Sequence, residues 1–294
     1  MSDTPAPKSF RSRRKGALSL VAGTALAAVS IFTGVGTASS TTTGAVRKVS
    51  PTKKPVTPKK PVTSQTTVAV AGAKKNCTVK IMPLGDSLTA FPDSYRGALF
   101  RQLQALGYKI DFVGSAYWEP TGGGDPNGEG HGGYTIGPDE RIDSEGKPGN
   151  IAQNVDSWVN SAKPDVILLT IGTNDLSANS IKAAAAPGKL RALVEHIATT
   201  YPATKLIVGD IPLNIYNVKA PADTIAVNEV ARSLGNASGT DNIVYGETSS
   251  NLTRLGFEPV SGLSDGTHFT AAAGELFAKA WLPSLQPILD ARAC

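Results

Sequence analysis

The segment "TVKIMPLGDSLTAF", residues 78–91, decides how the rest of the chain is interpreted. Its first eight residues are mostly apolar or β-branched and end at Gly85, which is typical of a buried strand. Asp86 and Ser87 follow directly. Functional side chains of α/β sheets gather just beyond the carboxyl ends of the strands. We therefore expect the hydroxyl of Ser87 at the mouth of a sheet and Asp86 in the turn beside it, although a serine that only caps a turn has the same local pattern.

Strand-like and helix-like segments alternate along the remaining chain. Further strands are predicted at 109–115, 165–172, 204–212 and 242–248, and helices at 95–107, 183–202, 222–235 and 270–285. The run "DVILLTIG" (165–172) is almost continuously hydrophobic, as in a strand that is covered on both faces of a parallel sheet. Strands that alternate with helices imply crossover connections. The sequence thus predicts an α/β fold with a doubly wound parallel sheet between two layers of helices.

The glycine-rich segment 118–149 interrupts this alternation. Long connections of this kind in compact domains are usually functional. Within it, "DPNGE" offers oxygen atoms from Asp125, Asn127 and Glu129, a fragment of a calcium-loop pattern. A structural calcium ion and an ordinary loop are both open interpretations, and no cofactor is expected to be required.

The N-terminal quarter does not have the composition of a folded domain. In residues 1–38, basic residues precede the uncharged run "GALSLVAGTALAAVSIFTGVG" and small residues follow it, which indicates a cleaved export signal. A retained membrane anchor is the alternative, and the general and twin-arginine export routes both stay open. Residues 39–75 are rich in Thr, Pro and Lys and are predicted to be a linker. Residues 76–294 are long enough for one domain with its own core.

Charge and cysteine content follow the same division. Residues 1–75 carry +12 and residues 76–294 carry −7, so the folded part is acidic and nucleic acid is not an expected partner. The linker lysines suit either contact with an anionic cell-wall polymer or membrane surface, or a solvated spacer. Cys77 and Cys294 stand at the two ends of the predicted domain. In an exported protein they are expected to form one disulfide, with two free thiols as the alternative.

A second serine also fits a catalytic pattern. "GLSDG" (262–266) matches G-x-S-x-G, which marks a nucleophile on a sharp turn between a strand and a helix. However, no strand-like run leads into Ser264, and no histidine follows His268 in the chain. Ser264 is therefore predicted to be a bystander, and Ser87 has the better setting.

Four short motifs follow one another along the chain: "GDS" (85–87), "GGYT" (132–135), "GTND" (172–175) and "DGTH" (265–268). This ordered set resembles the SGNH, or GDSL, hydrolase family, and the resemblance covers nearly all of residues 78–290. It implies the flavodoxin-like, three-layer fold of that family and a serine esterase activity.

The resemblance also implies a role for each matched residue. Ser87 matches the nucleophile, His268 the base and Asp265 the acid that orients it. The backbone N–H groups of Ser87 and Gly133 and the side-chain amide of Asn174 match the donors of an oxyanion hole. This set agrees with the chemistry, because a serine hydroxyl needs a base, the base needs one tautomer, and the oxyanion needs preorganised donors.

Other polar and aromatic side chains are predicted near this site. Asp86, His131 and Tyr134 are candidates for the substrate pocket, although Asp86 suits organisation of the turn and His131 suits ordering of the loop equally well. His196 lies within a helical pattern and is expected at the surface. The aromatic residues expected either to stack on sugar rings or to pack are Phe91, Tyr95, Tyr117, Trp118, Tyr134 and Phe269.

The segments around these motifs resemble the carbohydrate-esterase branch of the family, which includes secreted acetyl xylan esterases. This implies a monomeric, extracellular enzyme that deacetylates a plant polysaccharide such as xylan. Two alternatives remain: a secreted short-chain esterase or lipase of broad specificity, and a non-catalytic carbohydrate-binding protein.

Overall fold

The computed structural model describes residues 77–138, 149–177, 183–212, 214, 221–237 and 241–292. The predicted export signal (1–38) and linker (39–75) lie outside the described residues, so both stay predictions. Cys294 also lies outside them, and its disulfide with Cys77 stays a prediction as well. Within the described ranges, no helix is both long and apolar enough to cross a membrane.

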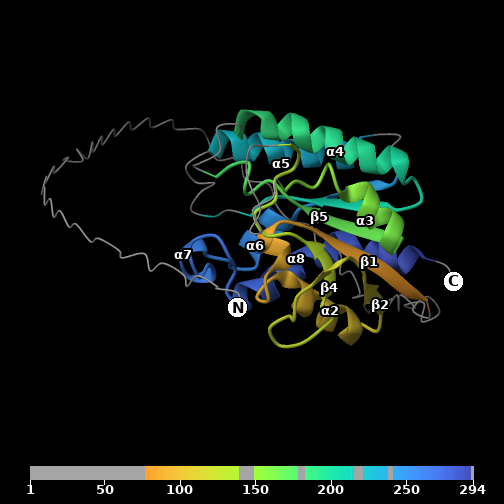
Figure 1. The fold of residues 1–294 in the computed structure, drawn as a ribbon. Helices are drawn as coiled ribbons and strands as arrows, with labels where there is room; N and C mark the ends of the chain where they lie inside the picture. The colour runs from red at the N-terminus through yellow and green to blue at the C-terminus, as the bar shows by residue number, and fades with distance from the viewer. Residues whose placement is uncertain are drawn as a thin grey trace, which may run out of the picture. The chain divides into compact units, whose positions relative to one another are not determined.

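Among the described residues, seven strands form the central sheet, part of which is labelled in Figure 1. They are β1 Thr78–Gly85, β2 Lys109–Phe112, β3 Ala116–Tyr117, β4 Asn127–Gly130, β5 Val166–Thr170, β6 Lys205–Gly209 and β7 Ile243–Gly246. Their order is β3-β4-β1-β5-β6-β7, and β2 also pairs with β1. Every pairing is parallel except that of β3 with β4. The predicted doubly wound parallel sheet is confirmed, with one short antiparallel strand added at its edge.

Strand β1 has two different neighbours on one side. Its first half pairs with β2, from Thr78 opposite Lys109 onward, and its last two residues pair with β4. On its other side β1 pairs with β5. The chain therefore builds the sheet outward from β1 in both directions, and the carboxyl ends of β1, β4 and β5 meet at one place. Such a switch point is where sheets of this kind bind ligands.

Helices cover both faces of this sheet. They are α1 Ser87–Ala90, α2 Tyr95–Ala105, α3 Val155–Ala162, α4 Ala186–Thr200, α5 Pro221–Gly235, α6 Thr248–Arg254, α7 Pro259–Gly262 and α8 Ala271–Ala291, with a 3-10 turn at Ala183–Ala185. Helices α2, α6 and α8 share one core with the sheet, and α3, α4 and α5 share another. Figure 1 shows α4 and α5 on the opposite side of the sheet from α2 and α8. The three predicted layers are thus present.

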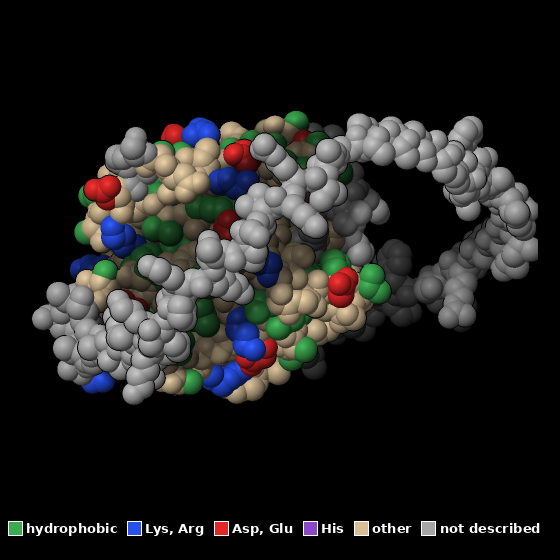
Figure 2. All heavy atoms as spheres, turned by 180° about the vertical axis from the view of Figure 1, so that it is seen from behind, with side chains coloured by type: hydrophobic (Ala, Val, Ile, Leu, Met, Phe, Trp, Pro, Cys, Tyr) green, Lys and Arg blue, Asp and Glu red, His purple; other side chains and the backbone are tan. Residues whose placement is uncertain are grey.

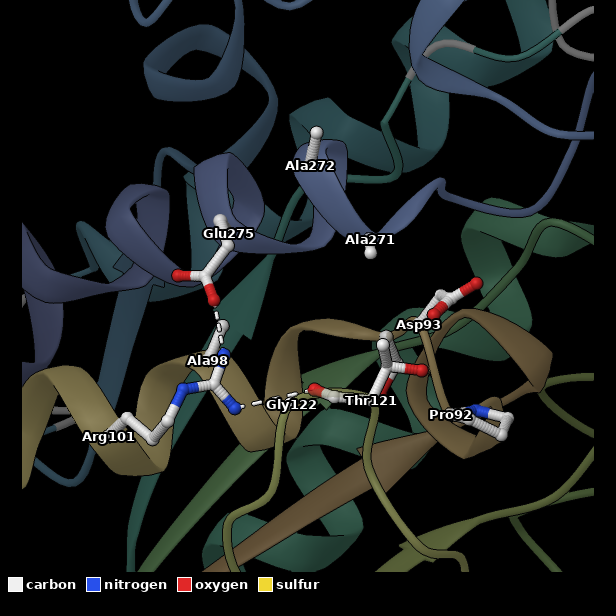
Figure 3. A pocket seen from close by; sticks show the side chains of 10 residues that line it. Pro92, Asp93, Ala98, Arg101, Thr121, Gly122, Ala271, Ala272 and Glu275 are labelled. Carbon is white, nitrogen blue, oxygen red and sulfur yellow. Dashed lines mark hydrogen bonds and ion pairs between the residues drawn. The ribbon is translucent and has the colours of Figure 1, made fainter.

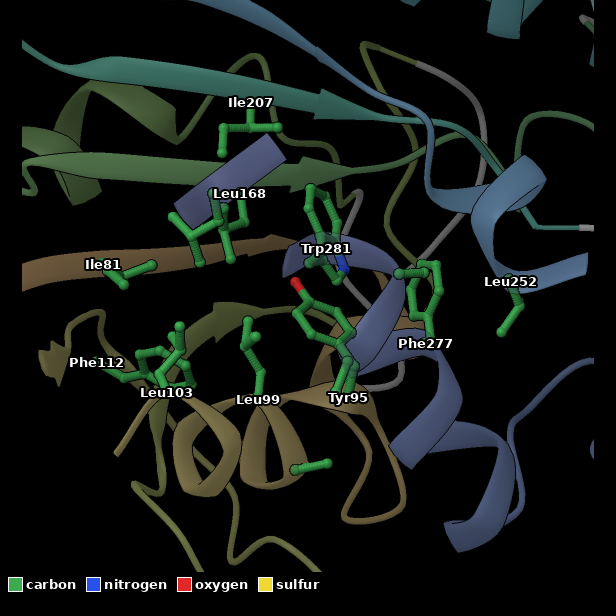
Figure 4. Packing of buried hydrophobic residues seen from close by; sticks show 14 of the residues in the cluster. Ile81, Tyr95, Leu99, Leu103, Phe112, Leu168, Ile207, Leu252, Phe277 and Trp281 are labelled. Carbon is green, nitrogen blue, oxygen red and sulfur yellow. The ribbon is translucent and has the colours of Figure 1, made fainter. Parts of the chain in front are cut away.

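Alternate residues of each central strand enter opposite cores. In β1, Ile81 belongs to the core of α2 and α8, whereas the next residue, Met82, belongs to the core of α3 and α4. Figure 4 shows Ile81, Leu168 and Ile207 from three strands facing Trp281 and Leu99 of the helices. Because successive strand residues point to opposite faces, a strand that is buried on both faces must be hydrophobic throughout.

The glycine-rich segment contains structure that its sequence does not signal. Strand β4, "NGEG", pairs with the end of β1 although glycine and asparagine disfavour strands. Glycine is needed there because a Cβ on Gly130 would lie 2.5 Å from the backbone nitrogen of Ala90 in α1. Strand β4 therefore contains glycine because its backbone must lie close to α1, and not because its residues favour strands.

A buried arginine holds this part of the fold together. The guanidinium of Arg96, 1% exposed, donates to five backbone carbonyl groups of the described residues. These belong to Thr89 and Ala90 of α1 and to Trp118, Pro126 and Asn127 of the glycine-rich segment. One side chain therefore joins the helix that carries Ser87 to the connection that leads into β4.

Figure 2 shows basic and acidic side chains interspersed over the part of one face that is not covered by grey atoms. No single-sign patch stands out among the coloured side chains of that view.

Candidate active site

Ser87 is the first residue of α1 and follows β1 after a single intervening residue. That residue, Asp86, is the N-cap of the helix, and its Oδ1 atom accepts a hydrogen bond from the backbone nitrogen of Leu88 at 3.0 Å. The turn leaves Ser87 only 6% exposed. The strand end and the cap thus fix the position of the serine at the switch point of the sheet.

His268 reaches Ser87 from the other end of the chain. Its Nε2 atom lies 2.9 Å from the Oγ atom of Ser87, and its Nδ1 atom lies 2.7 Å from Oδ2 of Asp265. A proton on Nδ1 satisfies the carboxylate and leaves Nε2 as an acceptor for the serine proton. The structure therefore brings the three predicted residues into one hydrogen-bonded chain.

Asp265 is held by the turn that it shares with His268. Its Oδ1 atom accepts from the backbone nitrogens of Thr267 at 2.9 Å and His268 at 2.8 Å. Partial burial raises the pKa of this carboxyl, but its hydrogen bonds with the backbone and ring of His268 and with Thr267 outweigh that effect and hold the pKa at about 2. Asp265 is consequently ionised at neutral pH, as an acid that orients an imidazole must be.

Gly133 lies in a turn at residues 131–134, which we call the oxyanion turn. The backbone nitrogen of Tyr134 donates to the carbonyl of His131 at 3.3 Å, and Gly133 has φ of +82°. This conformation favours glycine. A Cβ at Gly133 would meet nothing within 4 Å, so the space beside this residue is open.

Asn174 follows β5 and contacts the oxyanion turn. Its Nδ2 atom donates to the carbonyl of Tyr134 at 2.9 Å. A carboxamide nitrogen carries two N–H donors, so this bond is compatible with a bond to substrate. The structure thus gathers the ends of β1, β4 and β5 around one small volume, as their motifs predict.

His131 is anchored in the loop and also lies beside the site. Its Nε2 atom is 2.5 Å from Oε1 of the fully buried Glu129, and its ring stacks on those of Trp158 and Tyr134. Of the two roles predicted for His131, the contacts favour ordering of the loop. Glu129 supports the ring of His131, a role that the sequence did not indicate, since it suggested Glu129 only as a calcium ligand.

Asp86 is fully buried and does not line the mouth of the site. Burial raises its pKa to about 7, and the nearby charge of Asp175 acts in the same direction. Asp175 is also buried, and its Oδ2 atom accepts from the backbone nitrogen of Ile136 at 3.0 Å. Sequence reasoning missed Asp175, although it is the last residue of the "GTND" motif.

Of the six predicted aromatic residues, Tyr134 is half-buried and the other five separate into two groups. Tyr95 and Phe269 are buried and pack in the core. Phe91, Tyr117 and Trp118 are exposed. The ring of Phe91 lies against that of His268, with 4.2 Å between centroids. Phe91, which the sequence predicts near the site, therefore forms one of its walls.

Ser264 and His196 take no part in the hydrogen-bonded chain of Ser87, His268 and Asp265. The short helix α7, not a strand, precedes Ser264, and both the backbone nitrogen and the hydroxyl of Ser264 donate to the carbonyl of His268. Ser264 thus closes the turn that carries the histidine. His196 pairs with Asp156 on the exposed surface of α4 and α3 at 2.8 Å.

Two of the three residues proposed for calcium, Asp125 and Glu129, accept hydrogen bonds within the protein. Asp125 accepts from the backbone nitrogens of Phe112 and Asn127, and Glu129 accepts from Ser115. Among the described residues, no group of three or more His, Cys, Asp or Glu side chains is arranged to hold a metal ion. Calcium binding stays an untested prediction.

A cavity of about 240 Å³ opens beside the start of α8 (Figure 3). Figure 3 shows Arg101 and Glu275 paired across it, with Asp93 and Thr121 opposite. None of the predicted catalytic residues lines it. It neighbours the segment that carries His268 but is separate from the hydrogen-bonded chain.

The doubly wound sheet and the Ser–His–Asp arrangement at its switch point define the class as hydrolases of the SGNH type. Residues 84–276 match the model of the GDSL-like Lipase/Acylhydrolase family, and the chain belongs to this family. The resemblance drawn from the four motifs is therefore confirmed.

Known proteins similar to this chain include carbohydrate esterases. A Clostridium thermocellum family 3 carbohydrate esterase is 29% identical, with a TM-score of 0.58, over 73% of this chain and 98% of that one. A carbohydrate esterase family 3 structure from Talaromyces cellulolyticus is 25% identical, with a TM-score of 0.58, over 73% and 100%. A multidomain esterase of Ruminococcus flavefaciens is 29% identical over 234 residues, 73% of this chain. The match spans only 29% of that relative's length.

Proposed function

We propose that this protein is a secreted serine esterase that removes acetyl groups from a polysaccharide such as xylan. The observation that carries the proposal is the hydrogen-bonded chain from Ser87 through His268 to Asp265 at the switch point of the sheet. The two similar structures described as family 3 carbohydrate esterases support an acylated sugar as the substrate.

The reaction begins when Oγ of Ser87 attacks the ester carbonyl and its proton passes to Nε2 of His268. The carbonyl oxygen becomes an oxyanion, which the N–H groups of Ser87 and Gly133 and the amide of Asn174 stabilise. The N–H of Ser87 belongs to the first turn of α1 and has no partner within the helix. Asp265 stabilises the imidazolium that forms beside it.

The intermediate collapses when the bond to the sugar oxygen breaks and His268 returns its proton to that oxygen. An acetyl group then remains on Ser87. A water molecule, deprotonated by His268, attacks the acetyl carbonyl through the same oxyanion site, and the proton goes back to Ser87 as acetate leaves. The cycle consumes one water and restores the enzyme.

The first test compares wild type, Ser87→Ala and Ser264→Ala on a chromogenic acetate ester and on acetylated xylan. Ser87→Ala is expected to lower kcat by at least about 10⁴-fold, because no nucleophile remains. Ser264→Ala is the matched control, since it removes a hydroxyl from the same site region, and its kcat is expected to change by less than about threefold. Matching circular dichroism spectra show that all three are folded.

The outcomes separate the candidate functions. Acetate esters hydrolysed much faster than butyrate or octanoate esters support the acetyl esterase. A preference for longer acyl chains identifies a broad esterase or lipase. A folded wild type that turns over no ester, yet binds xylan, identifies a carbohydrate-binding protein and contradicts the proposal.

A further inference from the structure

We propose that Glu129 and His131 are positioning residues that hold the oxyanion turn, so that their hydrogen bond sets the rate of acyl transfer. This inference rests on the proposed function and assigns a role to two residues that do not touch the reacting atoms. It concerns the turn at 131–134, which carries the N–H of Gly133.

The turn is fixed at its first residue by a buried carboxylate. Glu129 is fully buried, and its Oε2 atom accepts from the backbone nitrogen of Ser115 at 2.6 Å. Its Oε1 atom is shared between the hydroxyl of Ser115 at 2.8 Å and Nε2 of His131 at 2.5 Å. The backbone nitrogen of His131 also donates to the carbonyl of Gly85, two residues before Ser87. His131 is therefore tied both to Glu129 and to the strand that carries the nucleophile.

The ring of His131 is also packed. It stacks on Trp158 of α3, with centroids 4.4 Å apart and planes 11° apart, and on Tyr134, with centroids 4.8 Å apart. Packing and the hydrogen bond to Glu129 thus act on the same imidazole. An experiment must separate the two, because packing alone would make His131 a purely structural residue.

The far end of the turn is fixed independently. Asn174 donates to the carbonyl of Tyr134, and two residues later the backbone nitrogen of Ile136 donates to buried Asp175. Both partners follow β5, so this end moves with the central sheet. At the other end, the backbone bond of His131 to Gly85 and the side-chain bond to Glu129 together limit the movement of Gly133.

Freedom at that end matters for the rate and much less for binding. An oxyanion donor acts only if it lies within hydrogen-bond distance of the position that the oxyanion occupies, and loss of one donor costs about 10²–10³ in kcat. A displacement near 1 Å can cost about 10²-fold. Ground-state binding of a short ester depends little on this donor, so KM is expected to stay nearly constant.

The test measures kcat and KM for His131→Phe and Glu129→Gln on the acetate ester. His131→Phe keeps an aromatic ring against Trp158 and loses the hydrogen bond, and its kcat is expected to fall at least about tenfold with KM within about twofold. Glu129→Gln keeps a neutral hydrogen bond, because its carbonyl can accept from the nitrogen of Ser115 while its amide donates to Nε2 of His131. Its kcat is expected to stay within about threefold of wild type.

Two further variants complete the experiment: His196→Phe is a control, and Ser115→Ala is a second test of the same contact. His196→Phe breaks the His196–Asp156 pair, which has similar length but lies on the exposed surface. Its kcat is expected to be unchanged. Ser115→Ala, at an exposed position where folding is not at risk, removes one hydrogen bond of Glu129. Its kcat is expected to fall about two- to fivefold at constant KM.

The possible failures are distinguishable. A folded wild type without esterase activity overturns the proposed function and this inference together. An active wild type with unchanged kcat in both His131→Phe and Ser115→Ala overturns this inference alone. A loss in Glu129→Gln as large as that in His131→Phe also overturns it, since the preserved hydrogen bond would then not be the determinant.

Discussion

Asp265 presents one carboxylate oxygen to two backbone N–H groups and the other to the ring of His268. Both oxygens therefore act as acceptors, which an ionised carboxylate provides and a carboxamide does not. With a pKa of about 2, Asp265 keeps this arrangement as pH falls well below neutrality. Because its folded pKa lies below the ordinary value, the stability contributed by this group is present above pH 4 and is lost as pH falls toward 2.

We predict that Asp265→Asn lowers kcat by about 10²–10⁴-fold without unfolding the protein. The asparagine oxygen must stay on the two backbone N–H groups, so its amide turns toward Nδ1 of His268. The imidazole then takes the tautomer with a proton on Nε2 and can no longer accept the proton of Ser87. Steady-state kinetics on an acetate ester measures the effect.

The matched control for this prediction is Asp156→Asn, which alters the other Asp–His pair of the described chain at 2.8 Å. Its kcat is expected to remain that of wild type. Equal kcat values for Asp265→Asn and Asp156→Asn would show that Asp265 does not select the tautomer.

Helix α1 is the element on which the site depends most, although it has only four residues. An isolated helix of that length is not stable, because nucleation is costly. Its position comes from its surroundings: Asp86 caps its start, β4 packs against it through Gly130, and Arg96 binds the carbonyls of Thr89 and Ala90. The tertiary structure, rather than helix propensity, holds Ser87.

We predict that Arg96→Ala lowers the free energy of unfolding by about 3 kcal/mol or more. The substitution leaves carbonyl groups of α1 and of the glycine-rich segment without their buried donor. Urea unfolding followed by tryptophan fluorescence measures the change. Arg191→Ala is the control, because Arg191 forms an exposed pair with Glu195 in α4 and is expected to contribute less than about 1 kcal/mol. Similar midpoints for the two variants would contradict the role assigned to Arg96.

At the scale of the whole molecule, the net charge is divided unequally along the chain. The described core elements all lie between residues 77 and 292, whereas the positive charge is concentrated in residues 1–75. The family match covers residues 84–276. Residues 77–292 therefore contain the elements that build the site. The basic residues 1–75 are expected to affect where the protein is held and not the reaction that it catalyses.

We predict that a chain beginning at Asn76 folds and hydrolyses acetate esters with kcat/KM within about twofold of the full chain. The net charge changes from +5 in the full chain to −7 in the truncated chain. At low salt, the full chain is therefore expected to bind anionic vesicles or teichoic-acid-like polymer, and the truncated chain is expected not to bind them. Co-sedimentation at low and high salt, together with kinetics, tests both statements. Loss of activity on truncation would show that residues 1–75 take part in the folded domain or its site.

Much of the architecture follows from local pattern. The continuous hydrophobic run of β5, the break after β1 and the alternation of strands with helices predict the doubly wound sheet, and the elements observed differ from the expected ranges mainly at their ends. Helix α3, by contrast, was not predicted, although Val155 and Val159 have helical spacing. Strand β4 was not predicted either, because its sequence "NGEG" has none of the apolar or β-branched residues by which a buried strand is recognised.

By itself, the sequence determined the fold class and the position of Ser87, because the alternation of segments and the end of the first strand predict both. The resemblance to the SGNH family implied the other site residues, which are Gly133, Asn174, Asp265 and His268. Only the tertiary structure decided what supports them. Glu129 and His131 are neighbours in the sequence, but their contacts with Ser115 and Trp158 come from other segments. The guanidinium of Arg96 likewise joins α1 to the glycine-rich segment, and burial by the surrounding layers raises the pKa of Asp86. Such contacts depend on how layers pack, and packing has no periodicity that a linear sequence displays.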